Sequence, residues 1–402
     1  MRRILALVVC MLLVFGLIPP QNALADEFLE DEPFVGTFSG SNEDSAEMLK
    51  IEAGAAIVLD AKSGRVLFEK NAYSRRAMAS TTKIMTAIVA IENGSLDGKV
   101  TVSRRAAEIW GSRIGLRTDE TMTLEELLYG MMLSSGNDAA IAIAEHIGGT
   151  VENFLDMMNR KAIEIGAKDT NFKSPHGLDM DGHYTTAYDL GIITQYALEN
   201  PVFSRIVGTK SATIPNRGLY NTNEMLDVYP GADGVKTGYT GKAGRCLVTS
   251  ATRDDWRIIS VVLNCSSRFT RAQSSKSILD YAFNNYKPYF LLRKGDFIKK
   301  LPVVKGISDY VAVEAMDDLY IPLRFDEVNS VETQLVLPES ITAPVYMGVE
   351  AGTVNFILNG KVIAHSGLKT TSGVRRKEFL DYLEGIFSTW HRFMREGIFL
   401  ES

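Results

Sequence analysis

Hydrophobic and polar positions follow different periods in different parts of this chain. Residues 55–60 and 65–70 are two apolar runs on either side of a short Gly-containing turn, which predicts a β-hairpin. Between about 123 and 196 the apolar residues recur at three- and four-residue steps, which predicts a group of amphipathic helices. Strand-like runs return after residue 233. The last of them, 256–264, is apolar almost throughout, as in a strand buried on both faces.

The order of these elements predicts the fold class. Strands, then helices, then strands and a closing helix indicate an α/β (α+β) domain over residues 51–292, with one antiparallel sheet flanked by helices and a helical subdomain. From 293 to 372 short strands recur, and Asn359-Gly360 between two of them is a strong hairpin signal. We therefore expect a second, small all-β domain of sandwich type.

The last stretch, 373–402, predicts an amphipathic helix. Its apolar residues recur at three- and four-residue steps between basic residues, a pattern suited to lying in a membrane interface. It carries too many charges to span a bilayer. The alternative is a helix packed on the β-domain. The apolar positions are Phe379, Leu383, Ile386, Phe387, Trp390, Phe393, Met394 and Ile398.

The N-terminus has the pattern of a secretory signal. Arg2 and Arg3 precede an apolar run over 4–18, and Ala23-Leu24-Ala25 fits a small-x-small cleavage site. We expect residues 1–25 to be removed on export; the alternative is an uncleaved N-terminal anchor. Residues 26–50 are acidic with few aromatics, which predicts a loosely ordered lead-in.

Composition narrows the class of protein. The chain has 402 residues, 46% hydrophobic and 23% charged, which is globular and too long for one ordinary core. A net charge of −6 gives no support for nucleic-acid binding. After cleavage only Cys246 and Cys265 would remain, on predicted neighbouring strands. They could form a disulfide or stay as two buried thiols, and we favour free thiols.

The first candidate for chemistry is the pair Ser80 and Lys83, at the start of an apolar helical segment. Residues three apart share a helix face, so the amine can reach the hydroxyl and, when neutral, take its proton. The helix N-terminus favours negative charge developing on oxygen. Alone the pattern is weak, because Ser-x-x-Lys arises about once or twice by chance in a chain this long. A serine cap followed by a solvated lysine is the alternative.

Two further motifs follow at junctions of predicted elements. Ser135-Gly136-Asn137 lies between two helices, where a hydroxyl can pass a proton and an amide can hold a substrate amide. Lys236-Thr237-Gly238 begins a strand, where lysine and threonine can hold a carboxylate and glycine leaves the strand edge clear for an extended peptide. Taken singly, these could be a cap-and-turn and an exposed lysine beside a glycine bulge.

In this order the three motifs resemble those of penicillin-binding proteins and class A β-lactamases. More narrowly, the chain is similar to the D-alanyl-D-alanine carboxypeptidases, the low-molecular-mass penicillin-binding proteins, in its motifs and in its order of parts. The resemblance implies a β-lactamase/transpeptidase-like catalytic domain. Tyr239 departs from it, since many relatives have His there, which leaves rate and substrate preference open. Further similar segments are 174–178, 185–190 and 221–223.

The resemblance implies a serine mechanism without metal or cofactor. Ser80 attacks the carbonyl between the two terminal D-alanines of a peptidoglycan stem peptide, and Lys83 takes its proton. Lys236 would lower the pKa of Lys83 and so favour the neutral amine. D-alanine leaves, cross-linking is limited, and penicillin acylates and inhibits Ser80. The remaining implied roles are proton relay for Ser135, substrate positioning for Asn137, an open strand edge at Gly238, carboxylate binding for Thr237 and Arg271, and an oxyanion hole from the N–H groups of Ser80 and Tyr239.

Other functions stay open at this stage. A serine β-lactamase is disfavoured, because no Glu-x-x-Leu-Asn segment lies between Asn137 and Lys236. A catalytically idle scaffold is disfavoured by the intact motifs. DD-endopeptidase or transpeptidase activity would use the same acyl-enzyme. His176 and His183 are interpreted as turn and packing residues. The expected partners are stem peptides, β-lactams and, through the C-terminal helix, the outer face of the cytoplasmic membrane, with no nucleic acid.

Overall fold

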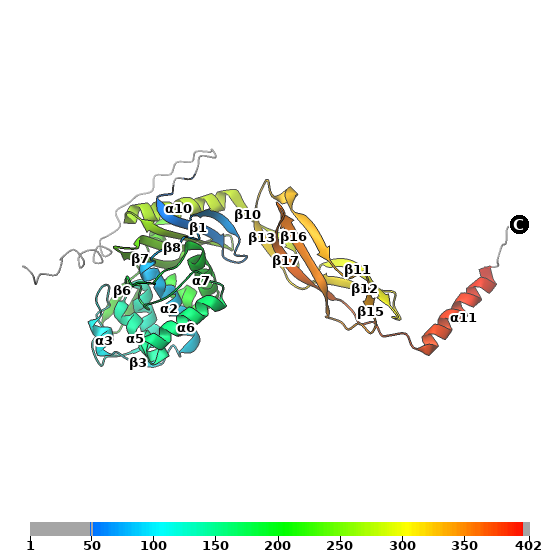
Figure 1. Ribbon diagram of the computed structural model, residues 1–402, viewed down its shortest axis with the longest axis horizontal. Helices are drawn as coiled ribbons and strands as arrows, with labels where there is room; N and C mark the ends of the chain where they lie inside the picture. The colour runs from blue at the N-terminus through cyan, green and yellow to red at the C-terminus, as the bar shows by residue number, and fades with distance from the viewer. Residues whose placement is uncertain (1–48, 50, 397–402) are drawn as a thin grey trace, which may run out of the picture. The chain divides into compact units, whose positions relative to one another are not determined.

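The computed structural model describes residue 49 and residues 51–396, so the predicted signal peptide and almost all of the acidic lead-in lie outside the described residues. The chain divides into two compact units, Met1–Asn284 and Asn285–Ser402, called here the N-terminal and C-terminal units (Figure 1). The predicted boundary at 292/293 lies one strand later. The difference arises because β10 (Tyr286–Leu292) pairs with β13 (Leu319–Arg324) of the C-terminal unit.

An antiparallel five-stranded sheet forms the centre of the N-terminal unit, in the order β2-β1-β9-β8-β7. The predicted hairpin is confirmed as β1 and β2, and the predicted apolar strand as β9, which pairs with β1 on one side and β8 on the other. Because β9 is a central strand, nearly all of its residues are buried. The strands are β1 (Ala53–Asp60), β2 (Val66–Lys70), β7 (Ala232–Thr240), β8 (Gly244–Arg253) and β9 (Trp256–Cys265).

Helices cover both faces of this sheet. In Figure 1, α10 (Arg268–Asn285) runs along one face, where Ser275 contacts Ser260 of β9 with 2.7 Å between their hydroxyl oxygens. On the other face α7 (Ala187–Glu199) packs closely, because a Cβ at Gly191 would lie 2.6 Å from Leu59 of β1. The predicted antiparallel sheet between helices is thus confirmed.

The helical subdomain packs around α2 (Lys83–Asn93), whose residues 83–90 are all buried. The predicted helix at Ser80 begins differently: Ala79–Thr82 form a 3-10 turn, η3, and α2 starts at Lys83. α2 ends at Asn93 and is followed by Gly94. The other elements here are α3 (Arg104–Glu108), α4 (Leu124–Leu133), α5 (Asn137–Gly148), α6 (Val151–Glu164), α8 (Pro201–Val207), α9 (Met225–Val228), and the strand pairs β3 (Lys99–Thr101) with β4 (Thr121–Thr123) and β5 (Ser211–Ile214) with β6 (Arg217–Tyr220).

The C-terminal unit is all-β up to its last helix, as predicted. Its six-stranded sheet has the order β14-β16-β17-β12-β11-β15. The predicted hairpin is confirmed at Asn359-Gly360, where both residues have positive φ, 50° and 75°, as a two-residue hairpin turn requires. The elements are β11 (Phe297–Val304), β12 (Tyr310–Ala315), η4 (Val328–Ser330), β14 (Glu332–Val336), β15 (Ile341–Thr342), β16 (Glu350–Leu358) and β17 (Lys361–Thr370).

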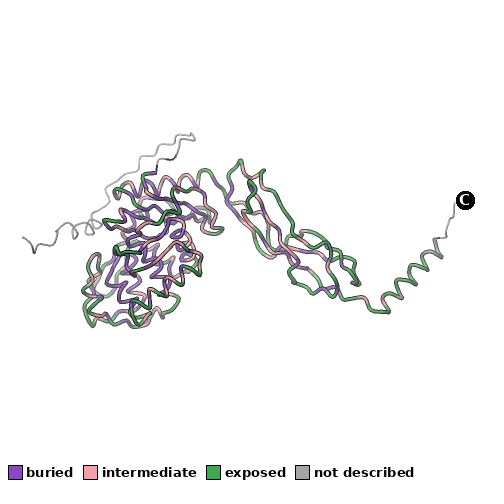
Figure 2. Tube along the Cα trace, in the orientation of Figure 1, coloured by how far each residue is buried: buried purple, intermediate pink, exposed green. Residues whose placement is uncertain are grey.

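The predicted C-terminal helix is α11 (Phe379–Glu396). Most of its apolar side chains whose burial is described are exposed, among them Phe379 at 76%, Phe387 at 63% and Trp390 at 62%, and Ile398 lies outside the described residues. Figure 2 shows most of the described part of α11 as exposed. Among the described residues, no helix is long and apolar enough to cross a membrane.

Candidate active site

The site is built around Lys83, the first residue of α2, whose side chain is completely buried. Its amine lies 2.9 Å from the Ser80 hydroxyl oxygen, as the three-residue spacing predicts. The amine also donates to the side-chain oxygen of Asn137 at 2.7 Å and to the backbone oxygen of His176 at 2.9 Å. Ser135 lies slightly farther away, with its hydroxyl oxygen 3.4 Å from the amine.

These contacts orient the Lys83 amine. Two of its directions are taken by carbonyl oxygens, those of Asn137 and His176, which can only accept hydrogen bonds. A further direction faces the Ser80 oxygen. A neutral amine has two N–H bonds and one lone pair, so satisfying both carbonyl groups turns the lone pair toward the Ser80 hydroxyl. The geometry therefore suits proton transfer from serine to lysine.

The Ser135-Gly136-Asn137 motif forms the junction of α4 and α5 and is held by a loop over 110–116. Ser135 has φ 59°, an uncommon conformation for a residue with a side chain, and is buried. The Asn137 amide donates to the Trp110 carbonyl at 3.0 Å while its oxygen accepts from Lys83. The two ends of the amide therefore have different partners, and its orientation is fixed.

The Lys236-Thr237-Gly238 motif lies in β7 and approaches Ser80 closely. A Cβ at Gly238 would lie 2.9 Å from the Ser80 nitrogen, so only glycine permits this approach without a shift. Lys236 is buried and its amine donates to the Thr237 carbonyl at 3.1 Å. The structure thus brings Ser80, Lys83, Ser135 and Asn137 together and sets the strand of the third motif against them.

Thr237 and Arg271, the two residues expected to bind the substrate carboxylate, have different surroundings in the structure. The Thr237 hydroxyl lies 2.7 Å from that of Thr222, beside the site. Arg271, expected to bind the substrate carboxylate, is fully buried and forms a bidentate ion pair with Glu224 at 2.8 and 3.0 Å. Glu224 follows Thr222 by two residues, so Arg271 supports the segment that contacts Thr237.

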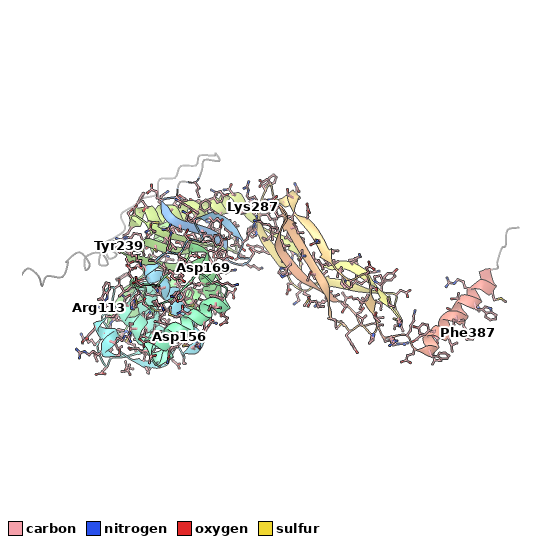
Figure 3. The ribbon with its side chains drawn as sticks, in the orientation of Figure 1. Arg113, Asp156, Asp169, Tyr239, Lys287 and Phe387 are labelled. Atoms are coloured by element: carbon pink, nitrogen blue, oxygen red, sulfur yellow. The ribbon has the colours of Figure 1, made fainter. Side chains whose placement is uncertain are left out.

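Tyr239 stacks on an arginine. The Arg245 guanidinium carbon lies 3.9 Å from the centre of its ring, across the β7–β8 pairing that sets the two residues opposite each other. Tyr239 and Arg113, of the loop that covers Asn137, both appear at the left margin of the N-terminal unit in Figure 3. The tyrosine at this position thus contributes an aromatic contact between β7 and β8.

Both nearby histidines have structural hydrogen bonds. Burial, followed by the positive charge of Lys83, lowers the pKa of His176 to about 3, and burial lowers that of His183 to about 4. His183 accepts from the Lys173 N–H, and its other nitrogen lies 2.9 Å from the Thr82 hydroxyl. That hydroxyl donates to Ala79, so His183 donates to Thr82. His183 is therefore neutral and fixes the turn before α2.

The two cysteines of the sheet are free and buried, in agreement with the preferred alternative. Burial raises the pKa of the Cys265 thiol to about 12, with a smaller contribution from Cys246. The Cys265 thiol is therefore protonated at neutral pH and a poor nucleophile.

Sequence reasoning missed several groups that complete the site. Asp138 accepts from the N–H groups of Ile114 and Leu116 at 3.1 and 3.0 Å, and Arg217 donates to the carbonyl oxygens of Ile114 and Gly115 at 2.8 Å each. Asp138 directly follows the Ser135-Gly136-Asn137 motif, so its position in the sequence could have identified it as part of the site. Arg217, the Trp110 carbonyl and the His176 carbonyl come from distant positions and carry no local signal.

Comparisons with known proteins agree with this geometry. A model of the D-alanyl-D-alanine carboxypeptidase family matches residues 42–267, and a model of the penicillin-binding protein 5 C-terminal domain matches residues 286–376. D-alanyl-D-alanine carboxypeptidase DacF of Bacillus subtilis is 35% identical over 85% of this chain and 91% of its own length. The corresponding values for DacA of Escherichia coli K12 are 32%, 85% and 89%.

Solved structures give the same result. Penicillin-binding protein 5 of Haemophilus influenzae has a TM-score of 0.74 and is 31% identical, covering 83% of this chain and all of that one. A mutant of the Streptomyces K15 DD-transpeptidase has a TM-score of 0.56 and is 35% identical, covering 58% of this chain and 99% of that one.

Proposed function

The chain belongs to the D-alanyl-D-alanine carboxypeptidase family of serine peptidases, and on that premise we propose which of its residues perform the reaction. Ser80 is the nucleophile and Lys83 its base. The observation that carries this assignment is the 2.9 Å contact between the Lys83 amine and the Ser80 oxygen, with two carbonyl oxygens orienting the amine. Asn137 and the His176 carbonyl hold the base in place.

Acylation begins when Lys83 takes the Ser80 proton and the serine oxygen attacks the carbonyl between the two terminal D-alanines. Negative charge then develops on the substrate oxygen, which the N–H groups of Ser80 and Tyr239 face. In other hydrolases one such donor contributes roughly 3–4 kcal/mol to the transition state. The closeness of β7 to Ser80 at Gly238 supports this pairing of donors.

The proton then moves from Lys83 to the leaving amine. Ser135 lies 3.4 Å from the Lys83 amine and can pass a proton between the two nitrogens. D-alanine leaves with that proton, and Ser80 keeps the rest of the peptide as an ester. Water then attacks the ester carbonyl while Lys83 takes a proton from it. Lys83 returns this proton to the Ser80 oxygen as the ester bond breaks, and the shortened stem peptide departs with a free carboxylate. Removing the terminal D-alanine limits cross-linking, because that bond supplies the energy for transpeptidation.

We assign recognition of the carboxylate of the terminal D-alanine to the Lys236-Thr237-Gly238 motif. Thr237 offers a hydroxyl and Lys236 a buried positive charge beside it. Arg271 acts as a positioning residue, because its guanidinium holds Glu224 and thereby the segment with Thr222. Gly238 keeps the strand edge open, so that the substrate peptide can lie along β7 as an added strand.

The assignment is tested by D-alanine release. The chain lacking residues 1–25 and its Ser80→Ala variant would be incubated with a peptide ending in D-Ala-D-Ala, and free D-alanine measured. We expect release by the first and none by the second. Release by both would remove Ser80 from the mechanism. Release by neither, with both proteins folded, would favour an idle scaffold or a strict cross-link endopeptidase.

Similarity to a structure titled DD-transpeptidase favours a second candidate activity. The same Ser80 ester could be attacked by an amine in place of water. Adding a D-amino acid or glycine to the assay separates the two, because transfer would give a peptide with a new C-terminal residue. We expect hydrolysis to dominate, since the chain matches the carboxypeptidase family model.

β-Lactams are proposed as covalent inhibitors. Their strained amide presents a carbonyl to Ser80, and the acyl-enzyme lacks a dedicated loop glutamate for its hydrolysis. Mass spectrometry should find one penicillin bound per chain, stable for far longer than one turnover of the peptide. Rapid turnover of penicillin would indicate a β-lactamase.

Export and membrane attachment complete the proposal. We infer that residues 1–25 direct export and that α11 lies in the outer interface of the cytoplasmic membrane. The exposed apolar side chains of α11 support the second inference, since water is a poor environment for such a face.

A further inference from the structure

Three segments meet at the end of the C-terminal unit from which α11 departs, and we call them together the tip. They are the β11–β12 connection (304–309), the segment before β16 (344–349) and the chain before α11 (374–377). Backbone hydrogen bonds join them: Ile307 donates to Arg375 at 3.1 Å and Lys377 to Lys305 at 2.8 Å. Val345 and Val374 bond to each other in both directions at 2.9 Å.

The tip exposes apolar side chains that the fold directs outward. Met347 is 73% exposed, Tyr346 68% and Ile307 49%. Their neighbours Val345 and Gly306 are buried, so the alternation of the backbone keeps Tyr346 and Ile307 outside, and Met347 is exposed in the turn that follows. Val304 and Val349 at 44% and 49% add to the same surface. Single exposed apolar residues are ordinary, but a group at one end of a domain indicates a binding surface.

Basic residues surround this apolar group. Lys305, Arg375 and Arg376 are exposed at the tip. Such side chains are attracted to anionic lipid headgroups, and their aliphatic parts can lie along an apolar surface while the charge stays in the headgroup layer. Apolar side chains within a basic rim are the composition of a surface that enters a membrane interface.

The tip is tied to the first turn of α11. Arg375 forms a bidentate ion pair with Asp381 at 2.5 and 2.7 Å, and the Glu378 N–H donates to the same carboxylate at 2.7 Å. Phe379, the first helical residue, follows Lys377 by two positions. A bilayer that takes up the start of α11 therefore lies within reach of the tip.

We propose that the tip is a second membrane-contacting surface, which enters the same anionic bilayer interface as α11. This inference rests on the proposed membrane attachment of α11. With the helix alone, the β-strands could pivot about residues 377–379. A second contact removes that freedom and fixes how the C-terminal unit stands on the membrane.

Vesicle binding tests the proposal on the chain lacking residues 1–25. The tip variant combines Ile307→Ser, Tyr346→Ser and Met347→Ser. The helix variant combines Phe387→Glu and Trp390→Glu. The matched control is Phe325→Ser, because Phe325 is 89% exposed but follows β13, at the other end of the C-terminal unit. Each protein would be mixed with vesicles of phosphatidylglycerol and phosphatidylcholine and with vesicles of phosphatidylcholine alone, and D-alanine release and thermal unfolding would report that it is folded.

We expect the tip variant to bind the anionic vesicles at least tenfold more weakly than wild type, because three apolar side chains would no longer enter the bilayer interface. The control should bind like wild type, the helix variant should lose binding, and neutral vesicles should bind all forms more weakly. If the tip variant binds like wild type while the helix variant does not, the tip inference is wrong and the helix anchor stands. If the helix variant also binds like wild type, the anchor itself is wrong.

A second measurement reports insertion directly. Tyr346→Trp in a chain carrying Trp390→Phe places a fluorophore at the tip. Quenching by lipids brominated on their acyl chains, beyond that of the Trp390→Phe parent, is expected. No added quenching would overturn the proposal and would leave the tip as a surface for a protein.

Discussion

At the scale of single residues, the site depends on backbone positions as much as on reactive side chains. Gly177 has φ +97°, and a Cβ there would lie 2.0 Å from the Ala79 carbonyl oxygen. Gly238 approaches Ser80 from β7. Two glycines therefore let a turn and a strand close around the nucleophile. Side chains on either would move the elements that carry Ser80.

Gly238→Ala should abolish most activity while leaving the protein folded. The added methyl would lie 2.9 Å from the Ser80 nitrogen, so β7 or η3 must shift. We expect the rate of penicillin acylation to fall about 100-fold, with a loss of about 1–3 kcal/mol in the free energy of unfolding. Gly241→Ala is the matched control, since a Cβ there meets nothing within 4 Å. Equal effects of both substitutions would contradict the packing argument.

The buried histidines predict sensitivity to acid. Burial lowers the pKa of His183 from 6.5 to about 4, so the unfolded chain binds a proton that the folded protein does not. Its stabilising contribution is complete above pH 6.5 and is lost as the pH falls toward 4, by an amount on the order of 1–3 kcal/mol. Denaturant unfolding at pH 7 and pH 5 should show a smaller loss for His183→Gln than for wild type. His146→Gln, an exposed position, should behave like wild type.

At the scale of elements, the loop over 110–116 connects stability with catalysis. Its N–H groups bind Asp138, its carbonyl oxygens bind Arg217, and its Trp110 carbonyl holds the Asn137 amide. The loop over 110–116 is neither helical nor part of a sheet. The side chains of Asp138 and Arg217 therefore supply the hydrogen bonds that a helix or sheet would otherwise supply.

Arg217→Ala should therefore slow acylation although Arg217 does not reach the substrate in the mechanism. Its guanidinium also pairs with Glu120 at 2.7 Å, with both side chains mostly buried. Loss of these bonds should loosen the loop and the Asn137 amide, lowering kcat about tenfold and the free energy of unfolding by about 2–3 kcal/mol. Arg205→Ala removes a more exposed pair with Glu125 and should change stability by less than about 1 kcal/mol and kcat not at all. A normal kcat in Arg217→Ala would show that the loop does not position Asn137.

Elements with a local signal were predictable from the sequence, and those formed by distant contacts were not. The β1–β2 hairpin, the apolar β9 and the Asn359-Gly360 turn follow from periodicity and turn chemistry. The 3-10 start at Ser80 was not foreseen, because Gly177 and Gly238 approach from far along the chain. The ion pair of Arg271 with Glu224 likewise carries no local signal, because the two residues lie 47 positions apart.

At the scale of the whole molecule, the two units differ in how they are stabilised. A large core joins the sheet to the helical subdomain and α7 in the N-terminal unit. In the part of the C-terminal unit that the structure describes, the buried apolar residues form small separate clusters. The proposed catalytic groups lie in the first unit, and the surfaces proposed for the membrane lie in the second.

Unfolding should accordingly occur in two steps. The C-terminal unit, with less buried apolar surface, should unfold at a lower denaturant concentration. Fluorescent penicillin labelling of Ser80 should survive the first transition seen by circular dichroism and disappear in the second. A single transition followed by both measurements would show that the units stabilise each other.

The contact between Lys83 and the His176 carbonyl limits which mutations of the gene can disturb Lys83. Lys83 binds a main-chain oxygen there, and every amino acid has that oxygen. A substitution at codon 176 therefore cannot remove this hydrogen-bond acceptor of Lys83. It can displace the acceptor only by changing the path of the turn, which Gly177 determines. A saturation library selected for function should accept more substitutions at codon 176 than at codon 177. Selection would then act more strongly on Gly177, which has no side chain, than on the imidazole of His176.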